Sequence, residues 1–142
     1  MADLDLVRRL GAADHGLVVI AVARPSGTVH TSVVNAGVLD DPDTGQDCVG
    51  FVVGGGGKKL DYIRQTERAA VVFRAGWEWV SVEGLARIIG PGDRATDELA
   101  VLLRDIFKAA GGTHDDWDEY DRVMAAERRA AVLVEPQRIT GN

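Results

Sequence analysis

The segment CVGFVVGGGGKKLDYIRQTERAAVVFRAGWEWVSVEGLARII, residues 48–89, is the most informative part of the chain. Runs rich in β-branched and aromatic residues at 48–53, 69–75 and 77–89 favour three strands. Four glycines end the first run, and a short helix is predicted to begin near Lys58. The last run is long enough to curve, and Gly84 within it is a candidate for a β-bulge.

The residues before this segment predict two more strands. The run LVVIAVA at 17–23 and the stretch 28–39 flank a turn signal, Arg-Pro-Ser-Gly at 24–27, so we predict a hairpin. The acidic stretch DDPDTGQD at 40–47 is predicted to be an exposed loop that leads to the strand at 48–53. Three consecutive strands without a helix between them favour an antiparallel sheet.

Helices are predicted mainly near the ends of the chain. Apolar spacing indicates a short helix after Asp3, a helix over 93–110 with Asp93 as its cap, and a helix over about 115–128. A sixth strand follows over 130–139, and its Pro136 indicates a strand end or an edge position. The sequence therefore predicts one mainly β domain over residues 1–142, a six-stranded antiparallel barrel with peripheral helices, rather than a doubly wound sheet.

Composition excludes several functions. The 142 residues include 22 Asp and Glu against 16 Lys and Arg, and the net charge of −6 argues against nucleic-acid binding or an anionic membrane surface. No apolar run approaches the ~20 residues that span a bilayer, and residues 1–10 lack the pattern of a secretion signal, so we expect a cytoplasmic protein. A lone Cys48 excludes an internal disulfide and is expected in the core, and the three histidines lack metal-ligand spacing.

Two of the three lysines in the chain are adjacent, at Lys58 and Lys59, directly after Gly54–Gly57. Glycines let the backbone approach a ligand closely, a helix N-terminus offers N–H groups, and lysines add positive charge. The spacing is not that of a Walker P-loop. Two interpretations follow from the residues: a site for phosphate or carboxylate, or a flexible loop with solvated lysines.

Trp77 and Trp79 would share one face of a strand, with Val80 and Val82 on the other. Three destinations remain open for this aromatic face. It is the floor of a pocket for a flat ligand, part of a subunit interface, or ordinary core packing.

The order strand, Gly-Lys turn, short helix, strand, followed by WVSVEGLA at 79–86, resembles the split β-barrel superfamily related to pyridoxamine 5'-phosphate oxidase. Within it, the chain is most similar to the actinobacterial coenzyme F420-dependent reductases of type B. GTVHTSVV at 27–34 resembles the family's second strand, 51–64 its third strand and phosphate-binding turn, and EPQRITG at 135–141 its closing strand. The resemblance implies an FMN-binding type of split barrel and a homodimer with a cofactor cleft between protomers.

The resemblance also implies a set of cofactor-binding residues. Lys59 falls where the family places the lysine that meets the cofactor phosphate, and the strand after Gly27 would line the ring. The family's turn usually carries polar and arginine side chains, whereas Gly54–Gly57 leaves backbone N–H groups and lysines for this task. The implied residues are His30, Ser32, Val33, Val34, Val52, Val53, Gly54, Lys58, Lys59, Trp77 and Trp79.

The implied activity is hydride transfer from reduced coenzyme F420, a deazaflavin, to a small conjugated organic acceptor. Such a site needs few catalytic side chains, because the cofactor carries the chemistry and the protein binds and orients. An FMN-dependent oxidoreductase of the same fold and a non-catalytic F420-binding protein are the alternatives. The missing arginine and serine clamp, and 13 arginines against three lysines, favour the deazaflavin.

Overall fold

The computed structural model describes residues 2–142, which form four helices and seven strands. The elements in chain order are α1 (Leu4–Ala13), β1 (Leu17–Ala23), β2 (Val29–Asp40), β3 (Asp47–Val53), α2 (Lys58–Thr66), β4 (Arg68–Ala75), β5 (Glu78–Ile89), α3 (Thr96–Ala109), α4 (Trp117–Ala126), β6 (Ala130–Val134) and β7 (Arg138–Gly141).

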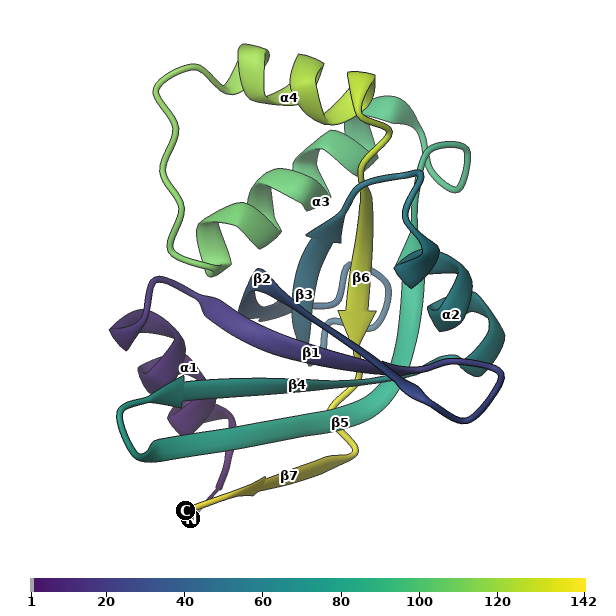
Figure 1. Ribbon diagram of the computed structural model, residues 1–142. Coiled ribbons are helices and arrows are strands. Elements are labelled where there is room, and N and C mark those ends of the chain that lie inside the picture. Colours follow the sequence, from purple (N-terminus) through teal and green to yellow (C-terminus); the bar gives the residue numbers. More distant parts are fainter. Residues whose placement is uncertain (1) are drawn as a thin grey trace.

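Six of the strands close into an antiparallel barrel (Figure 1). The ring runs β4-β1-β2-β3-β6-β5, and β5 pairs back with β4. Two long strands, β2 and β5, pass from one half of the barrel, with β1 and β4, into the other half, with β3 and β6. β2 pairs with β1 through its residues 29–35 and with β3 through 36–40, while β5 pairs with β4 through its residues 78–85 and with β6 through 86–89. The predicted six-stranded antiparallel split barrel with peripheral helices is confirmed.

The strand predicted over 130–139 is in fact two strands, β6 and β7, along the same edge of β5. Residues 135–137 between them lie opposite only Gly84 and Leu85, so the bulge is in this connection and not at Gly84 itself. Gly84 is needed for another reason. A Cβ at residue 84 would lie 1.6 Å from the carbonyl oxygen of Glu135.

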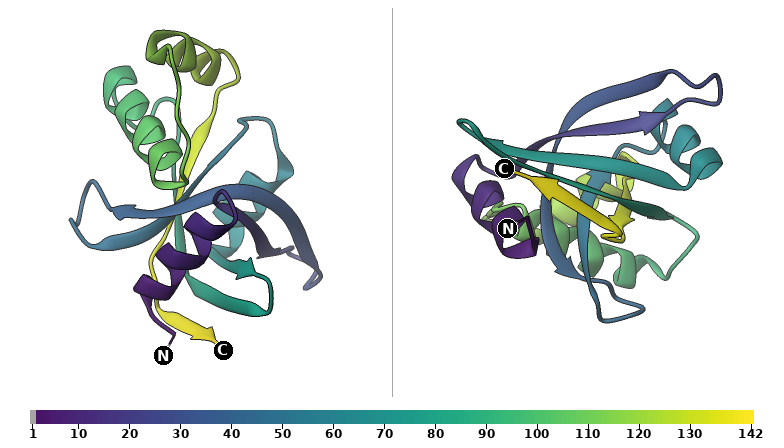
Figure 2. Two further views of the ribbon diagram at one scale, coloured as in Figure 1. Left: turned by 90° about the vertical axis from the view of Figure 1, so that its left-hand side faces the viewer. Right: turned by 90° about the horizontal axis from the view of Figure 1, so that it is seen from below.

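The helices cover different parts of the barrel. Leu6, Val7 and Leu10 of α1 share one buried face, as predicted, and they join Leu60 and Ile63 of α2 in the barrel core. α3 and α4 lie together on one side of the molecule, where they cover the outer face of β3 and β6 (Figure 2). No helix within residues 2–142 is long and apolar enough to cross a membrane.

Three predicted details are wrong at the ends of elements. α3 begins at Thr96, because the carboxylate of Asp93 accepts a hydrogen bond from the N–H of Gly90 and does not cap the helix. Asp41, in the loop predicted to be exposed, is buried and accepts a hydrogen bond from Arg87. Trp77 lies in the turn before β5, so it is not on the strand that carries Trp79.

Candidate functional site

The glycine turn, Gly54–Gly57, joins β3 to α2 and packs against the connection between α4 and β6. The N–H of Gly55 donates to the carbonyl oxygen of Glu127 at 3.3 Å. A Cβ at residue 55 would lie 2.4 Å from the carbonyl oxygen of Arg128, whereas a Cβ at Gly54 or Gly56 would meet nothing within 4 Å. Gly55 is therefore the glycine that this contact requires.

This contact brings two arginines next to the lysine pair. Arg128 has a left-handed backbone conformation, with φ of 51°, where the chain turns from α4 into β6. Burial, together with the positive charge of Arg129, lowers the pKa of Lys59 below its usual value. Among residues 2–142, no carboxylate forms an ion pair with Lys58 or Lys59. The turn is thus a local concentration of positive charge on an acidic chain.

Arg129 has spare hydrogen-bonding capacity. Its Nη2 atom lies 3.4 Å from the carboxylate of Glu127, a long ion pair. Its Nε atom is buried and has no hydrogen-bond partner within residues 2–142. A buried donor without a partner is unfavourable.

The N-terminus of α2 adds to this positive potential. Gly57 is the N-cap and provides no side-chain hydrogen bond, so N–H groups of the first turn remain available to an acceptor. The helix dipole also favours negative charge at this end. Lys58 and Lys59 stand in the first turn itself.

Three of the predicted ring-lining residues face the barrel interior. His30, Ser32 and Val34 lie on the same side of β2 as their buried β1 neighbours, whereas Val33 points outward and is 65% exposed. Within residues 2–142, this part of β2 pairs along one edge only, with β1. The Ser32 hydroxyl is buried there without a hydrogen-bond partner.

A side-chain contact connects this part of β2 to α2. The rings of His30 and Tyr62 lie 5.9 Å apart, centroid to centroid, and the guanidinium of Arg24 lies 5.8 Å from the Tyr62 ring centroid. The interior face of β2 and the helix that begins with the lysine pair are therefore neighbours. His30 is on β2 and the lysine pair is at the start of α2, so these two groups of predicted residues lie on neighbouring elements.

The other predicted residues lie on other parts of the barrel. Val53 is part of the barrel core, and Val52 packs beneath α3 and α4. Trp77 is 94% exposed in the β4–β5 turn, and Trp79 is on the outer face of β5. α2 leads into the beginning of the eight-residue strand β4, and the tryptophans follow its end. At roughly 3.3 Å per residue, the length of β4 places the tryptophans about 25 Å from the C-terminal end of α2 within one chain.

Trp79 belongs to an apolar outer face. Val33, Val19 and Val72 are direct neighbours across β2, β1 and β4. Leu17 and Trp79 are exposed on the same face of the sheet. We call these five residues the outer apolar face.

Sequence reasoning missed Arg128 and Arg129. The two adjacent arginines are visible in the sequence just before the last strands, but nothing in that pattern places them beside Gly55. The same holds for Tyr62, whose neighbour His30 comes from a strand that the barrel brings against α2. Both contacts depend on tertiary structure.

Comparison with known proteins identifies the fold. No family model matches the chain. Among solved structures, a conserved hypothetical protein from Mycobacterium tuberculosis has a TM-score of 0.73 at 16% identity, covering 99% of this chain and 84% of its own. An FMN-binding protein from Nostoc punctiforme related to pyridoxamine 5'-phosphate oxidase has a TM-score of 0.62 at 15% identity, with 96% and 79% covered.

A third similar structure is described as an F420 reductase. It has a TM-score of 0.61 at 14% identity, covering 90% of this chain and 91% of its own. At such low identities these similarities concern the fold alone. This chain thus has the split-barrel fold that is also found in an FMN-binding protein related to pyridoxamine 5'-phosphate oxidase and in an F420 reductase.

Proposed function

We propose that this protein is an F420-dependent oxidoreductase that binds its cofactor at the glycine turn and reduces a small conjugated organic acceptor. The observation that carries the proposal is the convergence of Lys58, Lys59 and Arg129 at the N-terminus of α2. Like charges held together raise the free energy of the folded protein, and an anion bound between them would lower it.

The residues of the glycine turn and of β2 fit a phosphorylated cofactor. The lysines and the free N–H groups of α2 would hold the phosphate, with the positive charge of Arg129 beside them. The unpartnered hydroxyl of Ser32 would donate a hydrogen bond to a polar atom of the ring system. When bound, reduced F420 supplies a hydride, and the apolar interior next to Val34 would exclude water from the ring.

The extent of the positive charge supports F420 over FMN. FMN has one phosphate, whereas F420 continues from its phosphate into a tail of glutamates. Lys58, Lys59 and Arg129 place three positive charges near the start of α2, and a longer anionic tail would pair with those that a single phosphate leaves free. Arg64 does not belong to this group, because it lies in the last turn of α2, at the other end of the helix.

A homodimer is part of the proposal. The outer apolar face exposes valine, leucine and tryptophan side chains on neighbouring strands, which is unusual for a surface that only meets water. A second copy of the chain would cover it. Covering it would also bring Trp79 of one protomer close to residues of the other, since Trp79 is remote from the glycine turn in its own chain.

The test is a titration of the purified protein with F420 and with FMN, in which the quenching of cofactor fluorescence measures binding. We expect tighter binding of F420. Lys59→Gln and Arg129→Gln should each weaken it about tenfold, which corresponds to about 1.4 kcal/mol. The matched control is Lys108→Gln, which removes the third lysine, on α3, and should leave the affinity unchanged.

Specific results would overturn each part. FMN that co-purifies with the protein, or that binds more tightly than F420, would refute the choice of cofactor. Failure of both cofactors to bind at micromolar concentrations would refute the site. Tight F420 binding without oxidation of the reduced cofactor by any of a panel of quinones and enones would leave a binding protein instead of a reductase.

A further inference from the structure

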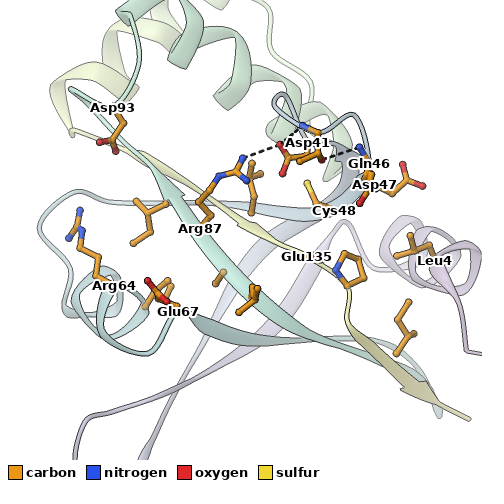
Figure 3. A pocket seen from close by; sticks show the side chains of 18 residues that line it. Leu4, Asp41, Gln46, Asp47, Cys48, Arg64, Glu67, Arg87, Asp93 and Glu135 are labelled. Carbon is orange, nitrogen blue, oxygen red and sulfur yellow. Dashed lines mark hydrogen bonds and ion pairs between the residues drawn. The ribbon is translucent and has the colours of Figure 1, made fainter.

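Arg24 is an arginine that pairs with no carboxylate of residues 2–142. Most of the 13 arginines of this acidic chain do form such a pair. Figure 3 shows one example, Arg87 in the wall of a cavity of about 890 Å³, whose Nη2 atom donates to Asp41 Oδ1 at 3.0 Å. The guanidinium charge of Arg24 is therefore available to a ligand.

The β1–β2 hairpin holds Arg24 by one edge of its guanidinium. The backbone N–H of Arg24 donates to the carbonyl oxygen of Thr28 at 2.8 Å, and its Nη1 atom donates to the carbonyl oxygen of Val29 at 2.9 Å. Neither Nε nor Nη2 of Arg24 donates to any of the described residues. These two atoms form the edge of a guanidinium that can bind a carboxylate with two parallel hydrogen bonds.

Tyr62 of α2 packs against Arg24. The guanidinium lies 5.8 Å from the Tyr62 ring centroid, a contact that favours one orientation of the cation over the ring. His30 pairs with Val22, two residues before Arg24, so His30 and Arg24 lie on the same face of the hairpin. The His30 ring is 5.9 Å from that of Tyr62. Arg24, His30 and Tyr62 are all partly exposed, so a ligand can reach them from solvent.

A second arginine of the chain shows what such an arrangement binds. The guanidinium of Arg104 lies 5.5 Å from the Trp117 ring centroid, much as Arg24 lies over Tyr62. The Nε atom of Arg104 donates to Asp121 Oδ1 at 2.8 Å, and its Nη2 atom donates to the other oxygen of that carboxylate. An arginine that packs on an aromatic ring thus binds a carboxylate here through the same two donors, Nε and Nη2.

The helix that carries Tyr62 has no acid at the corresponding position. Asp121 follows Trp117 by four residues on α4, whereas the residue four after Tyr62 on α2 is Thr66. The Thr66 hydroxyl donates to the carbonyl oxygen of Tyr62 at 2.9 Å. A carboxylate at this position would therefore come from a ligand.

This position is next to the residues of the proposed cofactor site. Tyr62 follows Lys58 by four residues and Lys59 by three, so it lies on their side of α2, one helical turn further along. His30 precedes Ser32 by two residues on the same face of β2. A ligand that contacts Tyr62 and His30 would thus be a neighbour of a cofactor bound to the lysine pair and Ser32.

We infer that the acceptor is a planar conjugated carboxylate. Its carboxylate binds the Nε–Nη2 edge of Arg24, and its conjugated body packs against Tyr62 and His30. A neutral molecule of the same shape loses the charge-assisted hydrogen bonds to the guanidinium. The role of this ligand as acceptor rests on the proposed function, whereas its binding to Arg24 does not.

The test compares trans-cinnamate with trans-cinnamamide, which have the same shape and differ in charge. Each is titrated into the ¹⁵N-labelled full chain without cofactor and followed by amide chemical shifts. We expect shifts at residues 24–30 and at Tyr62, and cinnamate should bind about three- to tenfold more tightly than the amide, as expected for a partly exposed charge pair. Equal affinities, or shifts confined to other residues, would overturn the inference.

Variants identify the arginine. Arg24→Gln should reduce the affinity for cinnamate to that for cinnamamide, and Arg24→Lys, which keeps the charge without the planar fork, should have an intermediate effect. The matched control is Arg74→Gln, because Arg74 also donates from Nη1 to a backbone carbonyl, that of Gly76 at 2.9 Å, and forms no ion pair with the described residues. This control should leave the affinity unchanged. Full affinity for cinnamate in both Arg24 variants would refute the assignment.

A second titration, with the protein saturated with F420, identifies the source of the carboxylate. We expect cinnamate still to bind, because its site is beside that of the cofactor. Displacement of cinnamate by F420 would mean that Arg24 binds the glutamate tail, and this would overturn the inference about the acceptor. Failure of F420 to bind would refute the proposed function and the role as acceptor, whereas the cofactor-free titration decides separately whether Arg24 binds a carboxylate.

Discussion

The backbone of Gly55 lies directly against that of Arg128, so that a Cβ at residue 55 would lie 2.4 Å from the Arg128 carbonyl oxygen. The N–H of Gly55 donates to the preceding carbonyl, that of Glu127. This contact attaches the glycine turn to the beginning of β6 and sets the arginine pair beside the lysine pair.

Gly55→Ala tests this contact. The added methyl group has to displace backbone, so we expect the free energy of unfolding to fall by about 1–3 kcal/mol. Affinity for F420 should fall as well, because the arginines move away from the turn. Gly56→Ala is the control, since it has open space and no positive φ; it should leave stability unchanged or raise it by up to about 1 kcal/mol. Urea denaturation measures both, and equal losses in the two variants would contradict the contact.

Anion binding at the turn should depend on pH through Lys59. Burial and Arg129 lower the pKa of Lys59 from its ordinary value of 10.5, so this side chain loses its charge before an exposed lysine does. We therefore expect the affinity for the cofactor phosphate to fall as pH rises through the alkaline range below 10.5. In Lys59→Arg the charge persists, and the dependence should flatten. Titrations between pH 7 and pH 10 decide this, and identical profiles would rule out Lys59 as the titrating group.

The Asp41–Arg87 pair should contribute to stability in a way that depends on pH. Although burial opposes ionisation, hydrogen bonds from Arg87 and the backbone hold the pKa of Asp41 below its ordinary value of 3.8. Its contribution is complete above pH 3.8 and is lost as pH falls through the lower folded-state value. Asp41→Asn should cost about 1–2 kcal/mol at pH 7, and the difference from wild type should shrink below pH 3.8.

The control for this pair is Asp47→Asn. Asp47 pairs with Arg8 at 3.0 Å, but both side chains are exposed, so we expect a loss of at most about 0.5 kcal/mol. Chemical denaturation at pH 7 and pH 3 gives all these values. An Asp41→Asn variant as stable as Asp47→Asn at pH 7 would show that the buried pair is not important for stability.

Val33→Glu tests the homodimer. A charge in the middle of the outer apolar face should convert the dimer to a monomer, because burying an unpaired carboxylate in the interface is unfavourable. Val101→Glu is the control, since Val101 is a comparably exposed valine (57%) on α3, away from this face. Light scattering after gel filtration gives the molar mass. A wild-type monomer, or a Val33→Glu dimer, would refute the interface.

Local sequence signals were sufficient for most of the elements. Alternating or continuous runs of β-branched residues predicted the strands, and the apolar spacing at Leu6, Val7 and Leu10 predicted the buried face of α1. These patterns depend only on near neighbours. The end of β6 at Val134 was harder to predict, because the bulge at 135–137 arises from how β5 is paired, which no local pattern records.

The sequence by itself determined that the chain is a small mainly β domain, with a glycine turn and two lysines at the start of a helix. Only the tertiary structure decided what lies beside that turn and its helix: Arg129, just before β6, and His30 of β2, whose ring lies against Tyr62. It also decided that Trp77 and Trp79 lie far from the turn within one chain. The reason is physical. Residue type and spacing specify local conformation, but closing the barrel is what brings distant segments together, and charge and burial at a site depend on those segments.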